Sequence, residues 1–336
     1  MATIYEHIDE NKRRTVLLVL LFPLLFTVLV LATLWVALWL TQGQGYEPSL
    51  VSWNGLTVTT FQRTVLSWAA VVTPLCLLTA AGWILFSYFT GDEWMLSSAQ
   101  AVAVTRRSQP EIYRLVENLC ITRGLPVPRI YIIDDESLNA FATGRDPDHA
   151  SVALTKGIVK RLERAELEGV IAHELAHVEN RDIRLMLITV AGISFFTFLG
   201  EWLLRVAVRN SRGRKENGGL LLVFAALGFA CLLYGYLLAP LLRLAVSRRR
   251  EYQADATAAL TTRNPLALAS ALRKIASDCR VEALDKRESM AAMCIANPLA
   301  QAGLFSAISG LLATHPPIQK RIAVLEEMDH GYRGVN

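Results

Sequence analysis

The segment His173-Glu174-Leu175-Ala176-His177 carries two histidines four residues apart, with a glutamate beside the first. On an α-helix, residues at this spacing lie on one face with Cβ atoms about 5 to 6 Å apart, so both imidazoles can bind one tetrahedral metal ion. The pattern is the HExxH zinc motif, and we expect Glu174 to accept a proton from the attacking water and to return it to the leaving amine. The alternative is an exposed helix with two solvated histidines.

A third metal ligand must come from elsewhere in the chain, and Glu251 in the segment Ser-Arg-Arg-Arg-Glu-Tyr-Gln-Ala-Asp is the best candidate. Asp255 follows it by four residues, so the two carboxylates share one helical face. We expect Glu251 to bind the metal and Asp255 to hold the free N–H of an imidazole ligand. The alternatives are an ion pair of Glu251 with Arg248 or Arg250, and an ordinary surface charge for Asp255.

The composition of the chain indicates that a lipid bilayer is part of its solvent. Of the 336 residues, 53% are hydrophobic and 19% are charged, and the mean hydropathy of +0.34 is too high for an ordinary soluble domain. The net charge is only +4, and the basic residues flank apolar runs, which argues against a nucleic-acid partner. The five cysteines form no CxxC pair, so neither a disulfide framework nor a cysteine zinc site is indicated.

Residues 1–91 are expected to form an anchor with two transmembrane helices, at residues 15–40 and 64–90. Lys12, Arg13 and Arg14 precede the first helix, whereas residues 41–62 contain no Lys or Arg, so the positive-inside rule places the N-terminus in the cytoplasm. The region after residue 91 then lies on the cytoplasmic side as well.

Residues 92–184 are expected to form the first part of a catalytic domain, because charged residues return and helix and strand patterns alternate. A helix is predicted at residues 110–123, ended by Gly124, and another at residues 165–184 around the HExxH segment. Short strands at 130–133, 139–143 and 150–154 predict a small, mostly antiparallel sheet.

Residues 185–246 are expected to form an apolar, membrane-embedded helical hairpin, and residues 247–336 the second part of the catalytic domain. The first arm, at 185–200, is a marginal span because Glu201 and Arg205 interrupt it. The connection to the second arm, at 218–242, is basic, so two full crossings would break the positive-inside rule. The predicted fold class is therefore α+β and mostly helical, in a multi-pass membrane protein.

Several motifs resemble the HtpX-like family of membrane-bound zinc metalloproteases, gluzincins related to the CAAX prenyl endopeptidases. They are Trp-Met at 94–95, LNAFATG at 138–144, IAHELAH at 171–177, SRRREYQAD at 247–255 and THPPIQKRI at 314–322. The resemblance implies a gluzincin-type domain and one Zn²⁺ per chain held by His173, His177 and Glu251, with Glu174 as base and Asp255 as support.

The resemblance also implies residues that bind substrate. Asn139, Ala140 and Phe141 resemble an edge strand along which an extended peptide adds its backbone, although Asn139 also suits a turn with only local hydrogen bonds. His315 resembles a histidine that stabilises the tetrahedral oxyanion, with a helix cap or a core position as the alternative.

The predicted function is hydrolysis of peptide bonds in membrane or misfolded proteins, as in protein quality control, by an enzyme of the bacterial inner membrane whose site faces the cytoplasm. One alternative is a dedicated processing protease of the prenyl-endopeptidase type. Another is a non-catalytic membrane scaffold stabilised by zinc, although structural zinc sites usually have four protein ligands. The oligomeric state and the physiological substrates are left open.

Overall fold

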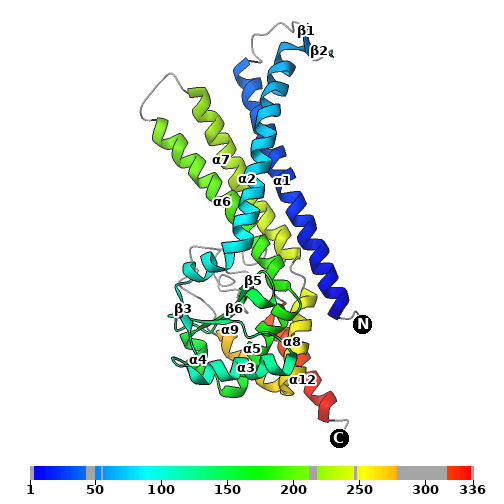
Figure 1. The fold of residues 1–336 in the computed structure, drawn as a ribbon, viewed down its shortest axis with the longest axis vertical. Coiled ribbons are helices and arrows are strands. Elements are labelled where there is room, and N and C mark those ends of the chain that lie inside the picture. Colours follow the sequence, from blue (N-terminus) through cyan, green and yellow to red (C-terminus); the bar gives the residue numbers. More distant parts are fainter. Residues whose placement is uncertain are drawn as a thin grey trace. The chain divides into compact units, whose positions relative to one another are not determined.

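The structure is a computed structural model that describes residues 4–42, 50–53, 56–211, 218–245, 248–277 and 316–333. The chain forms two compact units, whose elements are drawn in Figure 1. Each unit is assembled from segments that are far apart in the sequence. The mixed unit combines Met1–Thr15, Ser87–Val190 and Pro240–Asn336, and the helical unit combines Val16–Phe86 and Ala191–Ala239.

The described part of the chain contains long apolar helices. Three described segments are long and apolar enough to cross a bilayer, at Asp9–Trp39, Thr60–Ser98 and Asp182–Arg209. The apolar part of the fourth helix, within the residues that the structure describes, is the shorter segment Leu221–Gly235. The helices are α1 (Ile4–Gln42), α2 (Thr60–Ser98), α6 (Asp182–Ser211) and α7 (Gly218–Ala245).

Helix α6 is longer than the sequence predicts. The predicted apolar arm stops before Glu201 and Arg205, but the helix continues through both residues to Ser211. The two side chains lie one turn apart and form an ion pair with each other. Glutamate and arginine are also good helix formers, so the two charges do not interrupt the helix.

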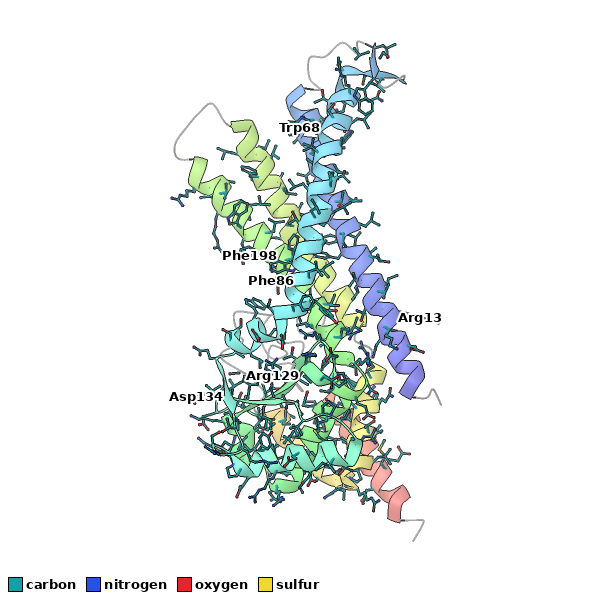
Figure 2. All side chains as sticks on the ribbon, in the orientation of Figure 1. Arg13, Trp68, Phe86, Arg129, Asp134 and Phe198 are labelled. Atoms are coloured by element: carbon teal, nitrogen blue, oxygen red, sulfur yellow. The ribbon has the colours of Figure 1, made fainter. Side chains whose placement is uncertain are left out.

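Small residues let α6 and α7 pack closely inside the helical unit. A Cβ atom on Gly200 would lie 2.8 Å from the carbonyl oxygen of Gly228, so the two backbones approach at a point where neither helix carries a side chain. Aromatic rings fill the neighbouring space, with Phe26 and Phe195 in edge contact at 4.9 Å. Large apolar side chains such as Trp68 and Phe198 project from the outside of their helices, as lipid solvation requires (Figure 2).

A four-stranded sheet organises the mixed unit. Its order is β3-β4-β6-β5, in which β4 and β6 are parallel and the other two pairs are antiparallel. The small, mostly antiparallel sheet is thus confirmed, whereas β3 is not predicted, since half of its residues are alanines, which have a low propensity for strands. The strands are β3 (Ala101–Val104), β4 (Arg129–Ile133), β5 (Ala140–Gly144) and β6 (Ala150–Thr155).

A second, two-stranded sheet belongs to the helical unit. The antiparallel strands β1 (Leu50–Trp53) and β2 (Leu56–Thr59) lie between α1 and α2, where no strand is predicted.

Helices of the mixed unit cover the sheet and build the main apolar core. The predicted helix at 110–123 is confirmed as α3, and Gly124 ends it in the left-handed conformation with a φ of 65°. Helix α5 packs against α8, α9 and β5, and α12 packs against α9 and α8. The elements are α3 (Pro110–Arg123), the 3₁₀ turn η1 (Pro147–His149), α4 (Lys156–Arg161), α5 (Arg164–Glu179), α8 (Arg248–Thr262), α9 (Pro265–Ser277) and α12 (Ile318–Arg333).

The HExxH helix is shorter than predicted. Instead of continuing to residue 184, α5 ends at Glu179, and Arg181 adopts a left-handed backbone with a φ of 59° before α6 begins at Asp182. A positive φ is unfavourable for arginine, so the residue type at position 181 does not predict a break there. The break changes the direction of the chain directly after the motif, and it places Asp182 beside the motif's second histidine.

Candidate metal centre

The N-terminus of α5 is fixed by a network of hydrogen bonds to α9. The Glu163 backbone N–H donates to the Glu166 carboxylate, which also accepts from Ser270 and from Lys274 at 2.6 Å. Burial alone would raise the pKa of Glu166, but these hydrogen bonds outweigh it and lower the pKa below its ordinary value. Further along α5, Gly169 faces Leu268, where a Cβ atom would lie 3.2 Å from that residue's Cα. Helix α5 is therefore held closely against α9.

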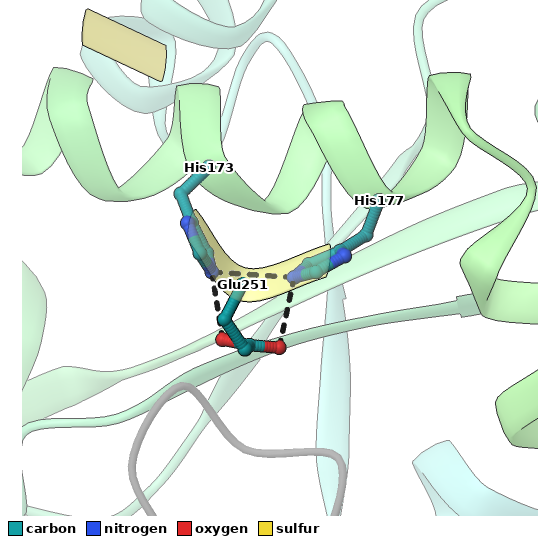
Figure 3. A group of neighbouring side chains, drawn as sticks. All are labelled: His173, His177 and Glu251. Carbon is teal, nitrogen blue, oxygen red and sulfur yellow. Dashed lines mark hydrogen bonds and ion pairs between the residues drawn. The ribbon is translucent and has the colours of Figure 1, made fainter. Parts of the chain in front are cut away.

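His173 and His177 project from one face of α5 toward the same point (Figure 3). Their Nε2 atoms lie 3.2 Å apart, and the two rings stand nearly perpendicular at an angle of 89°. His173 is 1% exposed, which contradicts the alternative of two solvated histidines. Both Nε2 atoms are therefore close enough to bind one metal cation.

Glu251 enters from α8 and completes a triangle of donor atoms below the two imidazoles (Figure 3). Its Oε2 lies 3.7 Å from His173 Nε2, and its Oε1 lies 3.7 Å from His177 Nε2. One donor atom from each residue can be chosen so that all three lie within 4.8 Å of one another. Two ligands of a tetrahedral zinc ion, each about 2.1 Å from it, are about 3.4 Å apart. The donor set therefore fits zinc in both chemistry and spacing.

Carboxylates hold both imidazoles from behind. Asp255 Oδ1 lies 2.9 Å from His173 Nδ1, and Asp182 Oδ2 lies 2.9 Å from His177 Nδ1. Each pair fixes its ring so that Nε2 points at the common centre, as metal-binding histidines require. Asp255 is 1% exposed, so the alternative of an ordinary surface charge is wrong. The sequence does not predict Asp182 as a site residue, because its position depends on the break after α5.

A buried arginine from α12 neutralises the acidic side of the site. Arg321 is 0% exposed, and its Nε and Nη2 each donate to Asp255 at 2.7 Å. Its Nη1 lies 3.4 Å from Glu251 Oε2. Burial alone would raise the pKa of Asp255, but the charges of Arg321 and His173 outweigh it and hold this pKa at about 2. Arg321 lies within the THPPIQKRI motif at 314–322, yet no spacing rule connects it to Glu251 or Asp255.

His177 carries a raised pKa in the metal-free site. Burial alone would lower it, but the hydrogen bond to Asp182 and the negative charge of Glu251 raise the pKa to about 9. A site that favours a proton on this imidazole also favours a metal cation that replaces the proton.

The other residues predicted for the site lie near it or outside the described part of the chain. Glu174 is buried on α5 directly after His173. Asn139 precedes the edge strand β5, and Ala140 and Phe141 begin it; Asn139 Oδ1 accepts the Ala140 N–H at 3.0 Å, a local hydrogen bond of the turn type. His315 falls outside the described residues. The catalytic and substrate roles of these residues remain predictions.

Comparison with known proteins assigns the chain to a family. Residues 106–329 match peptidase family M48. A protease HtpX homolog of Bacteroides fragilis is 41% identical over 324 residues, which cover 95% of this chain and 97% of that protein. A protease HtpX homolog of Tropheryma whipplei is 44% identical over 260 residues, which cover 76% of this chain and 85% of that protein.

The chain belongs to peptidase family M48. This confirms the predicted resemblance and the predicted enzyme class, because the family consists of metallopeptidases. A metallopeptidase needs a metal site, and His173, His177 and Glu251 can provide one. The alternative of a non-catalytic scaffold is not better supported. The crystal structure of S. mikatae Ste24p is a more distant likeness, with a TM-score of 0.44 and 17% identity, covering 88% of this chain and 62% of that chain.

Proposed function

We propose that this M48 peptidase is a membrane-integral zinc endopeptidase that hydrolyses peptide bonds of membrane or misfolded proteins, as in protein quality control. One zinc ion per chain is held by His173, His177 and Glu251. The observation that carries the proposal is the convergence of these three donors, from two separate helices, at distances that suit one tetrahedral ion.

The surrounding residues have defined tasks in this reaction. Zinc bound at the three donors supplies a Lewis acid that makes water a nucleophile near neutral pH. Glu174 accepts a proton from the attacking water and delivers it to the leaving amine. Asp255 and Asp182 keep the imidazoles of His173 and His177 oriented throughout. No covalent bond forms between the enzyme and the substrate.

We propose that the substrate binds in an extended conformation along β5. This strand lies at the edge of the sheet and packs against α5, so a peptide paired with it runs beside the metal ligands. Asn139, Ala140 and Phe141 are the residues proposed to contact it. His315 is proposed to stabilise the oxyanion that forms at the scissile carbonyl.

We propose that the site faces the cytoplasm from the bacterial inner membrane. The two protease HtpX homologs to which the chain is similar are bacterial proteins. Lys12, Arg13 and Arg14 precede the first apolar span, which favours a cytoplasmic N-terminus. The segment Met1–Thr15 belongs to the same unit as the zinc ligands, so the ligands share the side of the N-terminus. The four-segment division at residues 91, 184 and 246 remains part of this proposal.

Metal analysis combined with casein cleavage tests the proposed function. Purified wild type is expected to contain about one zinc per chain and to stop cleaving when a chelator removes it. Glu251→Ala is expected to lose both zinc and cleavage, whereas Glu111→Ala, which removes an exposed glutamate from α3, retains both. Stoichiometric zinc in Glu251→Ala would remove this residue from the site. Zinc-loaded wild type that cleaves no unfolded or membrane protein would favour a scaffold instead.

A further inference from the structure

The N-terminal segment of the chain reaches the zinc site through one side chain. Asn11 lies on α1, four residues before the end of the segment that belongs to the mixed unit, and it is 4% exposed. Its Nδ2 donates to Asp182 Oδ1 at 2.8 Å and to the backbone carbonyl of Asn180 at 3.0 Å. These contacts connect parts of the chain that are 171 and 169 residues apart.

The carbonyl that Asn11 binds belongs to the break after α5. Asn180 is the residue at the C-terminal end of that helix, and Arg181, which follows it, has the left-handed backbone. Carbonyl groups in the last turn of a helix lack helical partners, so an amide donor here stabilises the broken geometry. The same geometry places Asp182 within 2.9 Å of His177 Nδ1.

The side-chain amide of Asn11 also contacts α8, the helix that carries Glu251. Arg250 on α8 directs Nη1 to Asp182 Oδ1 at 3.0 Å and to Asn11 Oδ1 at 3.4 Å. Arg250 is 6% exposed and directly precedes Glu251. Asp182 is therefore held from three sides, by Asn11, by Arg250 and by the imidazole of His177.

We propose that Asn11 is a positioning residue of the zinc site, which links the N-terminal segment to two of the three ligands. It acts on His177 through Asp182, and on Glu251 through Arg250. This inference rests on the proposed function, because it assumes that the three donors hold zinc. On this proposal, the N-terminal part of α1 that belongs to the mixed unit is a structural part of the metal centre.

The chemistry of the position requires an amide. Asn11 donates through Nδ2 to a carboxylate and a carbonyl, and it accepts through Oδ1 from a guanidinium. Leucine has a similar volume but satisfies none of these groups, and aspartate would place a second carboxylate against Asp182. The neighbouring residues Asp9 and Lys12 are exposed and pair with each other. Within residues 9–12 of α1, Asn11 is the residue whose side chain is buried.

Zinc affinity of the full-length protein in detergent tests the proposal directly. The variants are Asn11→Ala and Asn11→Leu, and the matched control is Asn118→Ala, which removes an exposed asparagine from α3. Affinity is measured by competition for zinc with a chromophoric chelator, and the melting temperature of each metal-free variant is recorded beside it. Loss of a partner behind a metal ligand lowers metal affinity about 10-fold to 100-fold. Because Asn11 acts one residue further out, we expect a loss of roughly tenfold in both Asn11 variants and none in the control.

The two readouts separate positioning from packing. If Asn11 only fills space, Asn11→Leu restores wild-type zinc affinity, and that result would overturn the proposal. Equal zinc affinity in wild type and Asn11→Ala would overturn it as well, whatever happens to the metal-free melting temperature. Absence of zinc from the wild type would instead refute the proposed function, so the two failures are distinguishable.

Discussion

Replacing Arg321 with methionine tests the charge balance of the site. The substitution keeps an unbranched side chain of similar length but removes the cation that faces Asp255 and Glu251, both of which are buried. It leaves the carboxylates of Asp255 and Glu251 near the imidazoles of His173 and His177 without the guanidinium charge. We therefore expect a loss of stability that reflects unpaired buried charge more than lost packing volume.

The magnitude follows from the shifted pKa of Asp255. This pKa is about 2, below the ordinary value of 3.8, so ionisation of Asp255 contributes about 2 kcal/mol of stability. The contribution is fully present above pH 3.8 and is lost as pH falls toward 2, because the folded-state pKa is the lower one. Removing one partner of a buried pair typically costs about 3 to 5 kcal/mol. We expect Arg321→Met to lose about 3 kcal/mol at pH 7.

Thermal melting of the metal-free protein in detergent measures this loss. For a unit of this size, about 3 kcal/mol corresponds to a fall of roughly 10 °C in the melting temperature. Arg321→Lys keeps the charge but loses the two-pronged contact, so its fall is expected to be smaller. The double variant Arg321→Met with Asp255→Asn is expected to be more stable than the sum of the single losses predicts. A fall below about 3 °C for Arg321→Met, or full additivity in the double variant, would refute the reasoning.

Three further predictions concern the metal and the backbone. Because the pKa of His177 is about 9 in the metal-free site, protons compete with zinc for this imidazole below that pH. The apparent affinity for zinc is therefore expected to fall by up to about tenfold per pH unit as pH decreases. A zinc affinity that does not change between pH 7 and 9 would contradict this. Asp182→Asn is expected to weaken zinc binding about 10-fold to 100-fold in the same competition assay, and unchanged affinity would remove Asp182 from the support of His177. Gly157→Ala is expected to cost about 3 kcal/mol in thermal melts, because its Cβ would lie 2.0 Å from the Glu136 carbonyl oxygen; an unchanged melting temperature would contradict that packing.

Local patterns in the sequence predict the elements that carry the site. The apolar spacing at 110–123 and Gly124 define α3 to the residue, and two histidines four apart predict a shared face that α5 presents. Glu251 and Asp255 also lie four apart on one helix, and the structure brings Glu251 to the donor triangle and Asp255 to the imidazole behind it. These successes share a cause, because each depends on the period of a single helix.

The residues that sequence analysis misses act over long distances along the chain. Arg321 meets Asp255 across 66 residues, and Asn11 meets Asp182 across 171, so no local spacing connects either pair. Asp182 is missed for another reason, since the predicted helix is extended to residue 184, across the polar residues 179–182 where the structure has the break at Arg181. Helix α6 continues past Glu201 and Arg205, which form an ion pair with each other and are both good helix formers.

The most direct test of the zinc endopeptidase is the Glu174→Gln variant, purified as the full chain and assayed for zinc content and casein cleavage. The substitution keeps the size of the side chain and leaves His173, His177 and Glu251 in place. We predict zinc at the wild-type level and cleavage reduced by at least about 100-fold, because the side chain can no longer accept a proton. Zinc at the wild-type level with undiminished cleavage would contradict the assignment of Glu174 as the base, and with it the proposed mechanism.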